Sequence, residues 1–273
     1  MPELPEVETI RRGLRRTVRG KRIKNITISL PKVVRRHASK KEVINKARGK
    51  IVVSVKRRGK SLLFILCSSD VLIFRLGMTG QMLWSTPQFP LSKDKHTHVI
   101  IDFGEGERVL FRDIRQFGEV YLTTEEHLEK TLKIGTEPLE RDFTLEILKD
   151  ITSSSVRIKH LLMDQKKIAG IGNIYSDEIL FEAGIHPFKK ARMLKGEELK
   201  KLHQAIGSIL NEAIACRGDT IAQYRNIFGE SGHYQNFHRV YQREGDPCHR
   251  CNTPIKRVTI SGRSWHFCPH CQK

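Results

Sequence analysis

The first residues of the chain can supply a nucleophile and a proton-transfer group side by side. The sequence opens Met1-Pro2-Glu3, and removal of Met1 would leave Pro2 with a free secondary amine. An α-amino group has a pKa of about 7.7–8.0, so part of it is unprotonated near neutral pH without special burial. Such an amine can attack a sugar C1′ to give an iminium ion, while Glu3 moves protons at the sugar. A terminus of this composition can equally be disordered, or simply lead into a helix.

A second reactive pattern lies near the other end of the sequence. Four of the six cysteines form two pairs, each with two residues between its members: Cys248 with Cys251, and Cys268 with Cys271. Two such tight turns hold four thiolates at the spacing that tetrahedral zinc requires. A disulfide framework would suit a secreted protein, and nothing in the sequence indicates secretion. We therefore predict one structural zinc ion, with Cys67 and Cys216 as ordinary structural thiols.

The charge of the chain indicates its class of partner. Lys and Arg number 49 against 30 Asp and Glu, which gives a formal net charge of +19. Such an excess favours a polyanion, nucleic acid first, although ribosome-associated and membrane-surface proteins share it. No apolar run approaches the roughly 20 residues needed to cross a bilayer, and the start lacks the apolar core of a signal peptide. We expect a cytoplasmic protein with no membrane partner.

A helix must follow the reactive start, and a β-rich domain must follow that helix. Four apolar side chains recur at helical spacing before Gly20 ends the pattern: Val7, Ile10, Leu14 and Val18. Residues 21–123 then alternate between apolar and polar positions in short runs, which is typical of an antiparallel sandwich or barrel. The alternation is lost over residues 123–150, so we place a domain boundary there.

Beyond this boundary the apolar period is helical. One face of the segment 199–213 collects five apolar residues: Leu199, Leu202, Ile206, Ile209 and Ala213. Residues 169–174 form a glycine-containing turn that enters a helix, and the N–H groups of such a turn suit a phosphate. Tight packing explains two glycines at a helix start equally well. The second domain is therefore predicted to be helical.

Several longer motifs occur in one basic chain and in one order. They are residues 2–9, 57–60, 76–80, 113–118, 135–139 and 170–175, followed by the four cysteines. Together they resemble the bacterial formamidopyrimidine-DNA glycosylases, over residues 2–271. The resemblance implies an α+β multidomain fold. It comprises an N-terminal antiparallel β-sandwich with an N-terminal helix (1–135), a helix-two-turn-helix domain (136–235) and a four-cysteine zinc finger (236–273).

The resemblance also implies an activity and a partner. Family members excise oxidised purines, such as 8-oxoguanine and formamidopyrimidines, and then cut the strand at the abasic site by β- and δ-elimination. It assigns the Schiff base to Pro2, proton transfer to Glu3, assistance to Lys60, and phosphate binding with the second elimination to Arg263. The partner is damaged double-stranded DNA, bound by a monomer without a nucleotide cofactor. Because four thiolates leave no open position on zinc, a metal-activated water is disfavoured.

The remaining implied roles concern DNA binding. A base stacked in a duplex is out of reach, so the nucleotide must be turned outward and the gap filled. By resemblance the wedge consists of Met78, Arg115 and Phe117, although each of these could be an ordinary core or surface residue. Phosphate contacts, which set register without reading sequence, are implied for four residues: His96, Ser154, Lys159 and Asn173. The segment 225–235 is a candidate for a loop over the everted base.

The sequence departs from the family pattern in places, and two rival functions stay open. Arg75 stands where relatives commonly have His, Gln116 replaces a second basic residue, and Trp265 replaces a small polar residue. The serines around Ser154 occupy a tract that is often lysine-rich. These changes put affinity and opposite-base preference in doubt. The rivals are an endonuclease VIII-type enzyme for oxidised pyrimidines and a non-catalytic module that binds damaged DNA.

Overall fold

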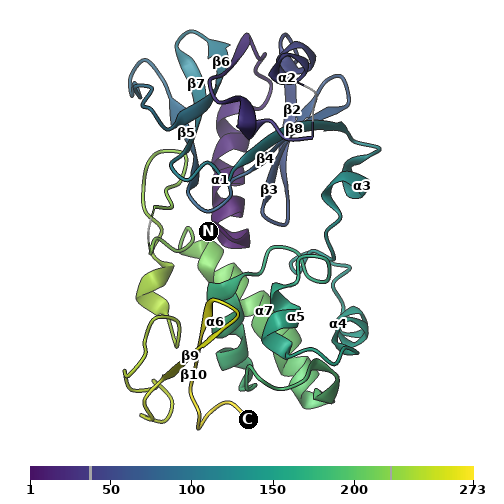
Figure 1. The fold of residues 1–273 in the computed structure, drawn as a ribbon, viewed down its shortest axis with the longest axis vertical. Coiled ribbons are helices and arrows are strands. Elements are labelled where there is room, and N and C mark those ends of the chain that lie inside the picture. Colours follow the sequence, from purple (N-terminus) through teal and green to yellow (C-terminus); the bar gives the residue numbers. More distant parts are fainter. Residues whose placement is uncertain (37–38, 222) are drawn as a thin grey trace. The chain divides into compact units, whose positions relative to one another are not determined.

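The computed structural model describes residues 1–36, 39–221 and 223–273 (Figure 1). They form two compact units, which we call unit 1 (1–133 and 217–233) and unit 2 (134–216 and 234–273). The chain passes from unit 1 to unit 2 between Lys133 and Ile134. The segment 217–233, however, belongs to unit 1, which interrupts the continuous helical domain expected over 136–235. It does so because Tyr224 and Ile227 are buried in the hydrophobic cluster of unit 1.

Unit 1 begins with the predicted helix, α1 (Leu4–Val18). Glu3 is its N-cap, and the Glu3 and Glu6 side chains cap each other's backbone N–H groups reciprocally. Glu6 in the first turn and Arg15 and Arg16 in the last turn also suit the helix dipole. The apolar stripe read from the sequence is fully buried. The sequence therefore fixes both the start and the buried face of this helix.

Two four-stranded antiparallel sheets form the sandwich that was predicted. One sheet has the order β1 (Asn25–Ile28), β6 (Thr97–Gly104), β7 (Glu107–Asp113) and β5 (Gly80–Ser85). The other has the order β2 (Val52–Arg58), β3 (Ser61–Leu66), β4 (Asp70–Arg75) and β8 (Glu119–Thr124). Short helices α2 (Lys40–Ala47) and α3 (Leu128–Leu132) accompany them. Side chains of α1 and of both sheets share one hydrophobic cluster, so the helix is part of the sandwich core.

Unit 2 is built from helices and one hairpin. The helices are α4 (Leu145–Thr152), α5 (Ile158–Met163), α6 (Asn173–Ala183) and α7 (Glu197–Ala215). The hairpin consists of β9 (Lys256–Ile260) and β10 (Arg263–Phe267). The five apolar residues predicted to share a face of α7 are all buried, and α6 is buried on nearly every side. Among the described residues, no helix is both long and apolar enough to span a membrane.

Candidate functional site

Pro2 and Glu3 lie at the start of α1, where several hydrogen bonds hold the backbone. Pro2 is buried and Glu3 is only 4% exposed. The Glu3 N–H donates to Glu6 Oε2 at 2.7 Å, and Glu6 Oε1 accepts from the Asp219 N–H at 2.8 Å. Gly218 lies beside this carboxylate in a left-handed conformation, with φ of 84°, and an added Cβ would lie 2.8 Å from Glu6 Oε1. Glu6 therefore orients the terminus and joins it to the segment 217–233.

That segment carries part of the loop expected over an everted base. Asn226 Oδ1 accepts from the N–H groups of Phe228 at 2.9 Å and Glu230 at 3.1 Å, which closes a tight turn. Ile227 is buried and its carbonyl accepts from the Trp84 N–H at 2.8 Å, whereas Phe228 is 60% exposed. The part of the loop within unit 1 is thus anchored at Ile227, and its next residue projects into solvent.

Lys60 lies in the turn between β2 and β3, and that turn is fastened to α1. Arg57 donates to the Gly59 carbonyl at 3.0 Å, and its Nε lies 3.4 Å from Glu8 Oε2. Burial acts to raise the pKa of Glu8, but hydrogen bonds and charge from Arg11, with those of Arg12 and Arg57, lower it overall. Glu8 therefore stays ionised at neutral pH, and its ion pair with Arg57 holds the Lys60 turn to α1.

The three residues predicted as a wedge occur together. Met78 lies in the first crossing loop (residues 76–79, between β4 and β5), and Arg115 and Phe117 lie in the second crossing loop (residues 114–118, between β7 and β8). Met78 is 43% exposed and Phe117 is 49% exposed, and the Arg115 guanidinium carbon lies 5.0 Å from the Phe117 ring centroid. Large apolar side chains projecting from adjacent loops are suited to entering a base stack.

His96 adjoins this region through its backbone. Its carbonyl accepts from the Asp113 N–H at 2.9 Å, and its N–H donates to Asp94 Oδ1 at 3.0 Å. Partial burial acts to raise the pKa of Asp94, but hydrogen bonds, the first from Arg112 at 2.6 Å, outweigh burial and lower that pKa to about 2. The turn that carries the half-exposed His96 is therefore held by an ionised carboxylate.

The four clustered cysteines of unit 2 fit a zinc ion. Their sulfurs all lie within 4.8 Å of one another, with separations of 3.9 Å for Cys248 and Cys271 and 3.5 Å for Cys251 and Cys268. Tetrahedral bonds of about 2.3 Å place sulfurs roughly 3.8 Å apart. The thiol donor set and its spacing therefore match the predicted structural zinc ion.

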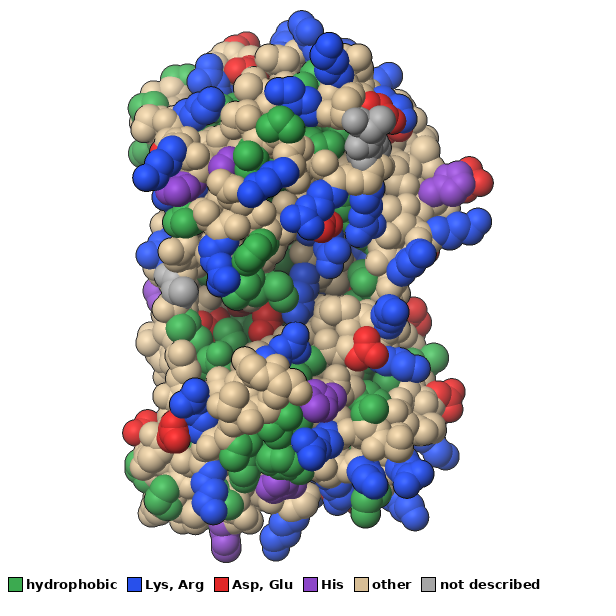
Figure 2. Space-filling model, viewed as in Figure 1, with side chains coloured by type: hydrophobic (Ala, Val, Ile, Leu, Met, Phe, Trp, Pro, Cys, Tyr) green, Lys and Arg blue, Asp and Glu red, His purple; other side chains and the backbone are tan. Residues whose placement is uncertain are grey.

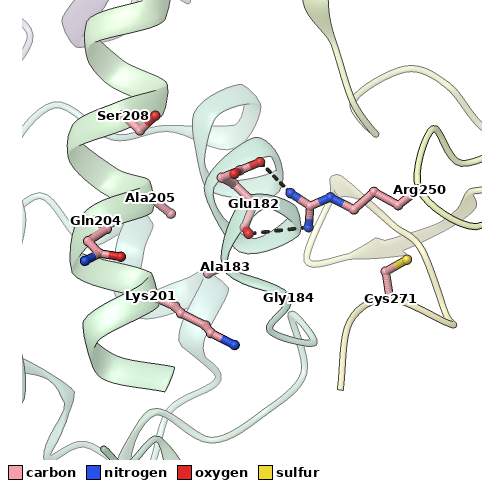
Figure 3. Close-up of a pocket in the computed structure, with 9 residues that line it drawn as sticks. All are labelled: Glu182, Ala183, Gly184, Lys201, Gln204, Ala205, Ser208, Arg250 and Cys271. Atoms are coloured by element: carbon pink, nitrogen blue, oxygen red, sulfur yellow. Dashed lines mark hydrogen bonds and ion pairs between the residues drawn. The ribbon is translucent and has the colours of Figure 1, made fainter. Parts of the chain in front are cut away.

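The first cysteine turn is attached to α6 beside a pocket of about 510 Å³ (Figure 3). Arg250 projects from this turn and pairs with Glu182 Oε2 at 2.6 Å. It also donates to the Phe181 carbonyl at 3.0 Å and lies over the Phe181 ring. Since Arg250 is committed to these contacts, its role in unit 2 is to anchor the finger to the helix.

Arg263 begins β10, immediately after the turn made by Ser261 and Gly262. Its Nη1 contacts Met163 Sδ at 3.6 Å. The next carbonyl along the strand, that of Ser264, accepts from Lys159 Nζ at 3.2 Å and from Asn173 Nδ2 at 3.0 Å. Two of the residues expected to contact phosphate therefore hold the strand that carries Arg263.

The structure corrects the direct phosphate role expected for Lys159. This side chain is 0% exposed, and its ammonium lies 2.6 Å from Asp177 Oδ1. Asp177 also accepts from the His266 N–H at 3.1 Å, and Lys159 lies 5.2 Å from the Trp265 ring. An ammonium buried in this way faces a carboxylate instead of DNA. Trp265, one of the departures from the family pattern, is likewise fully buried and is a core residue.

Ser154 lies in the connection between α4 and α5. It is half-buried, and its Oγ accepts from the Val156 N–H at 3.4 Å. Its carbonyl accepts from the Arg192 N–H at 2.9 Å. The hydroxyl thus serves a local turn, and the phosphate role of Ser154 stays a prediction.

Sequence reasoning missed the buried carboxylates that support these side chains. Asp113 and Asp177 each pair with residues far away in the sequence, so neither shows the three- or four-residue spacing of a helical pair. The supporting role of each carboxylate can be recognised only in the folded structure, where the carboxylate is buried against its distant partner. The surface charge, by contrast, follows from composition: Lys and Arg side chains are spread over the displayed face in Figure 2.

Comparisons with known proteins agree with this arrangement of domains. Residues 1–120 match the formamidopyrimidine-DNA glycosylase N-terminal domain, residues 134–225 match the H2TH domain of the same enzymes, and residues 245–273 match a zinc finger found in FPG and IleRS. The formamidopyrimidine-DNA glycosylase of Carboxydothermus hydrogenoformans is 44% identical over 274 residues, covering all of both chains. That of Bacillus subtilis is 42% identical over 276 residues, covering 100% of this chain and 99% of the relative.

Solved structures agree as well. A Lactococcus lactis FPG mutant in complex with Fapy-dG containing DNA has a TM-score of 0.92 at 34% identity, with complete coverage of both chains. MutM in complex with carbocyclic 8-oxo-G containing DNA has a TM-score of 0.90 at 35% identity, again with complete coverage. A β-sandwich unit with a capped Pro-Glu start, a helical domain and a four-cysteine finger define a DNA glycosylase of base-excision repair. The chain belongs to the formamidopyrimidine-DNA glycosylase family.

Proposed function

We propose that this enzyme removes oxidised purines, among them 8-oxoguanine and formamidopyrimidines, from duplex DNA and then cuts the strand at the abasic site. The proposal is carried by Pro2, which stands at a buried, reciprocally capped helix start in a chain whose relatives are formamidopyrimidine-DNA glycosylases along their whole length. A module that only bound damaged DNA would have no use for an amine at this position. The place of action is bacterial chromosomal DNA, and hence the cytoplasm.

Pro2 acts as the nucleophile once Met1 has been removed. The nitrogen lone pair forms a bond to C1′ while the glycosidic bond breaks, and the electron pair of that bond leaves with the base, which takes up a proton. The amine then loses its proton, and the C1′–O4′ bond breaks with its electrons on O4′, which is protonated, so that a C1′=N⁺ iminium forms. The resulting iminium withdraws electrons and makes the C2′–H acidic, so proton loss expels the 3′ phosphate and a second elimination expels the 5′ phosphate. Glu3 carries protons at the sugar during these steps. Lys60 places an ammonium beside the lesion and a neighbouring phosphate.

Opening of the duplex precedes this chemistry. Met78 and Phe117 fill the gap left by the everted nucleotide, and Arg115 supplies donors to the orphaned cytosine. The support for these roles is the exposure of both apolar side chains and the contact between Arg115 and Phe117.

Binding of the backbone is the task of His96, Asn173 and Arg263. Arg263 holds phosphates that flank the lesion and assists the second elimination. Zinc, held by the four cysteines, supplies a fixed fold for the finger and takes no part in bond cleavage, since its thiolates fill all four positions. We assign Lys159 to the support of Arg263 through the Ser264 carbonyl.

Borohydride trapping tests the proposal. Borohydride reduces the iminium and leaves the protein covalently bound to DNA, so the wild type is expected to be trapped on a duplex with 8-oxoguanine opposite cytosine. Pro2→Gly is expected to reduce trapping strongly, whereas Pro90→Gly, at an exposed loop position, should not. Trapping only on thymine glycol would indicate the oxidised-pyrimidine enzyme instead. Full activity in protein that retains Met1, seen by mass spectrometry, would exclude Pro2 as the nucleophile.

A further inference from the structure

The two crossing loops of unit 1 run side by side because the strands that flank them are paired with each other at both ends. Both pass from one sheet of the sandwich to the other. Where they meet the second sheet, Arg75 pairs with Glu119, and where they meet the first sheet, Gly80 pairs with Asp113. Each loop therefore starts at the strand pair where the other ends, and the two backbones are brought together between these two pairs.

The backbones touch at Gly77. This residue has φ of 63°, a left-handed conformation that favours glycine. A Cβ added there would lie 2.7 Å from the carbonyl carbon of Phe117 and 2.8 Å from the Gly118 nitrogen. No side chain fits at this point, so the close approach of the loops is built into the sequence.

A buried carboxylate and a hydroxyl join the loops beside this contact. Asp113 is 0% exposed; its Oδ1 accepts from the Thr79 hydroxyl, and its Oδ2 accepts from the Gly118 N–H at 2.7 Å. The Thr79 oxygen in turn accepts from the Arg115 N–H at 3.0 Å. A hydroxyl has one proton to give and lone pairs to receive, so it can serve both partners at once. We call this arrangement the Thr79–Asp113 clamp.

The clamp lies directly beside the two exposed apolar side chains of the crossing loops. Met78 immediately precedes Thr79, and Phe117 immediately precedes Gly118, so each exposed apolar residue is adjacent to a clamped position. Gln116, which immediately precedes Phe117, has φ of 59°, a left-handed conformation that costs a non-glycine residue energy and persists only where the surroundings impose it. The spacing of Met78 and Phe117 therefore depends on the clamped backbone.

We propose that Thr79 and Asp113 are positioning residues for the opening of the duplex. By fixing the two crossing loops to each other, the clamp makes Met78, Arg115 and Phe117 enter the DNA as one rigid body. This inference rests on the proposed function, because it assigns a support to the residues proposed to fill the gap. Asp113 is buried and the Thr79 hydroxyl is bound to it, so we expect the clamp to affect base eversion and to leave the elimination chemistry alone.

A pair of substitutions at one position tests the clamp. Thr79→Val keeps the branched shape and removes the hydroxyl, whereas Thr79→Ser restores it. We expect Thr79→Val to slow single-turnover excision of 8-oxoguanine from a duplex roughly tenfold, the effect of one lost charge-assisted hydrogen bond. Cleavage of a preformed abasic site, where no base must be unstacked, should change less than about twofold. Thr79→Ser should stay within about twofold of the wild type in both reactions.

The matched control is Thr123→Val, which removes another threonine hydrogen bond of unit 1, to Thr131 at 2.9 Å. Its excision rate should equal that of the wild type. Asp113→Asn replaces one carboxylate oxygen by an NH₂ group that faces the donors of Thr79 or Gly118, so it should slow excision further. If this variant does not fold, Thr79→Val still tests the clamp.

Two results would overturn the clamp. One is wild-type excision by Thr79→Val. The other is a parallel loss of excision, abasic-site cleavage and melting temperature, which marks a contact needed only for folding. Wild-type protein that does not release 8-oxoguanine at all would refute the proposed function itself, which separates the two failures.

Discussion

The crossing loops of unit 1 and the β9–β10 hairpin of unit 2 present exposed side chains by different physical means. In the loops, two sheet ends fix the backbone, and one buried carboxylate with a hydroxyl sets the spacing of Met78 and Phe117. In the hairpin, Arg263 depends on the Lys159–Asp177 ion pair and on the cysteine cluster. A large sandwich core supplies stability to the loops, whereas a finger of this size has little core of its own. The hairpin therefore needs ionic and metal support.

This difference predicts where substitutions harm folding and where they harm only activity. Residues that support the hairpin should be costly to change in stability. Residues at the tips of the crossing loops should be nearly neutral in stability and costly in catalysis. The two tryptophans report the two units separately, since Trp84 lies in unit 1 and Trp265 is buried in unit 2.

The largest effect is expected from the metal site. Cys248→Ser removes one of four ligands, and a structural zinc site contributes on the order of 10 kcal/mol to the fold that holds it. We expect loss of the bound metal, a red shift of Trp265 emission in a Trp84→Phe background, and loss of DNA cleavage. Cys67→Ser, at an exposed thiol outside the cluster, is the control and should keep one zinc per chain. Ordered Trp265 emission in metal-free Cys248→Ser would show that zinc does not support the hairpin.

The buried ion pair should come next. Lys159→Met leaves Asp177 buried without its ammonium, which costs about 3–5 kcal/mol in comparable cases. Urea unfolding followed at Trp265 should show this loss, and adding Asp177→Asn should recover most of it because no buried charge is then left. Lys200→Met, which breaks an exposed pair with Glu197, should leave the midpoint unchanged. If the double variant is as unstable as the single one, shape instead of charge holds Lys159 in place.

A tip residue of the crossing loops should behave in the opposite way. Phe117→Ala removes a half-exposed ring, so the free energy of unfolding should change by less than about 0.5 kcal/mol. Excision of 8-oxoguanine from a duplex should nevertheless fall at least about tenfold, because the ring no longer enters the base step. Phe89→Ala, at a ring that is 78% exposed in the same unit, provides the control. Equal excision by the two variants would remove Phe117 from the proposed wedge.

The same contrast explains what could be predicted from the sequence. Helix α1, the sandwich and the cysteine cluster follow from local signals, since each depends on spacing along the chain. Lys159 was expected to contact phosphate because its motif is shared with DNA-binding relatives, but its position is set by Asp177 on another helix. The burial of Ile227 in the core of unit 1 was also not predicted, since no local sequence pattern tells which domain a connecting segment joins.

The smallest effect concerns the turn that carries His96. The pKa of Asp94 is lowered to about 2 in the folded protein, against an ordinary value of 3.8, so the unfolded chain binds the proton more readily. Its contribution to stability is therefore complete above about pH 4 and is lost as the pH falls towards 2. Because the side chain is 40% exposed, solvent screening limits that contribution to less than about 1 kcal/mol.

Asp94→Asn should accordingly destabilise unit 1 slightly at pH 7 and not at pH 2. Urea unfolding followed at Trp84, in a Trp265→Phe background, measures unit 1 separately from acid release of zinc in unit 2. A difference that persists unchanged at pH 2 would trace the effect to packing of the amide instead of charge. A loss well above 1 kcal/mol at pH 7 would show that unit 1, like the hairpin, relies on an ion pair, and the contrast between the two regions would fail.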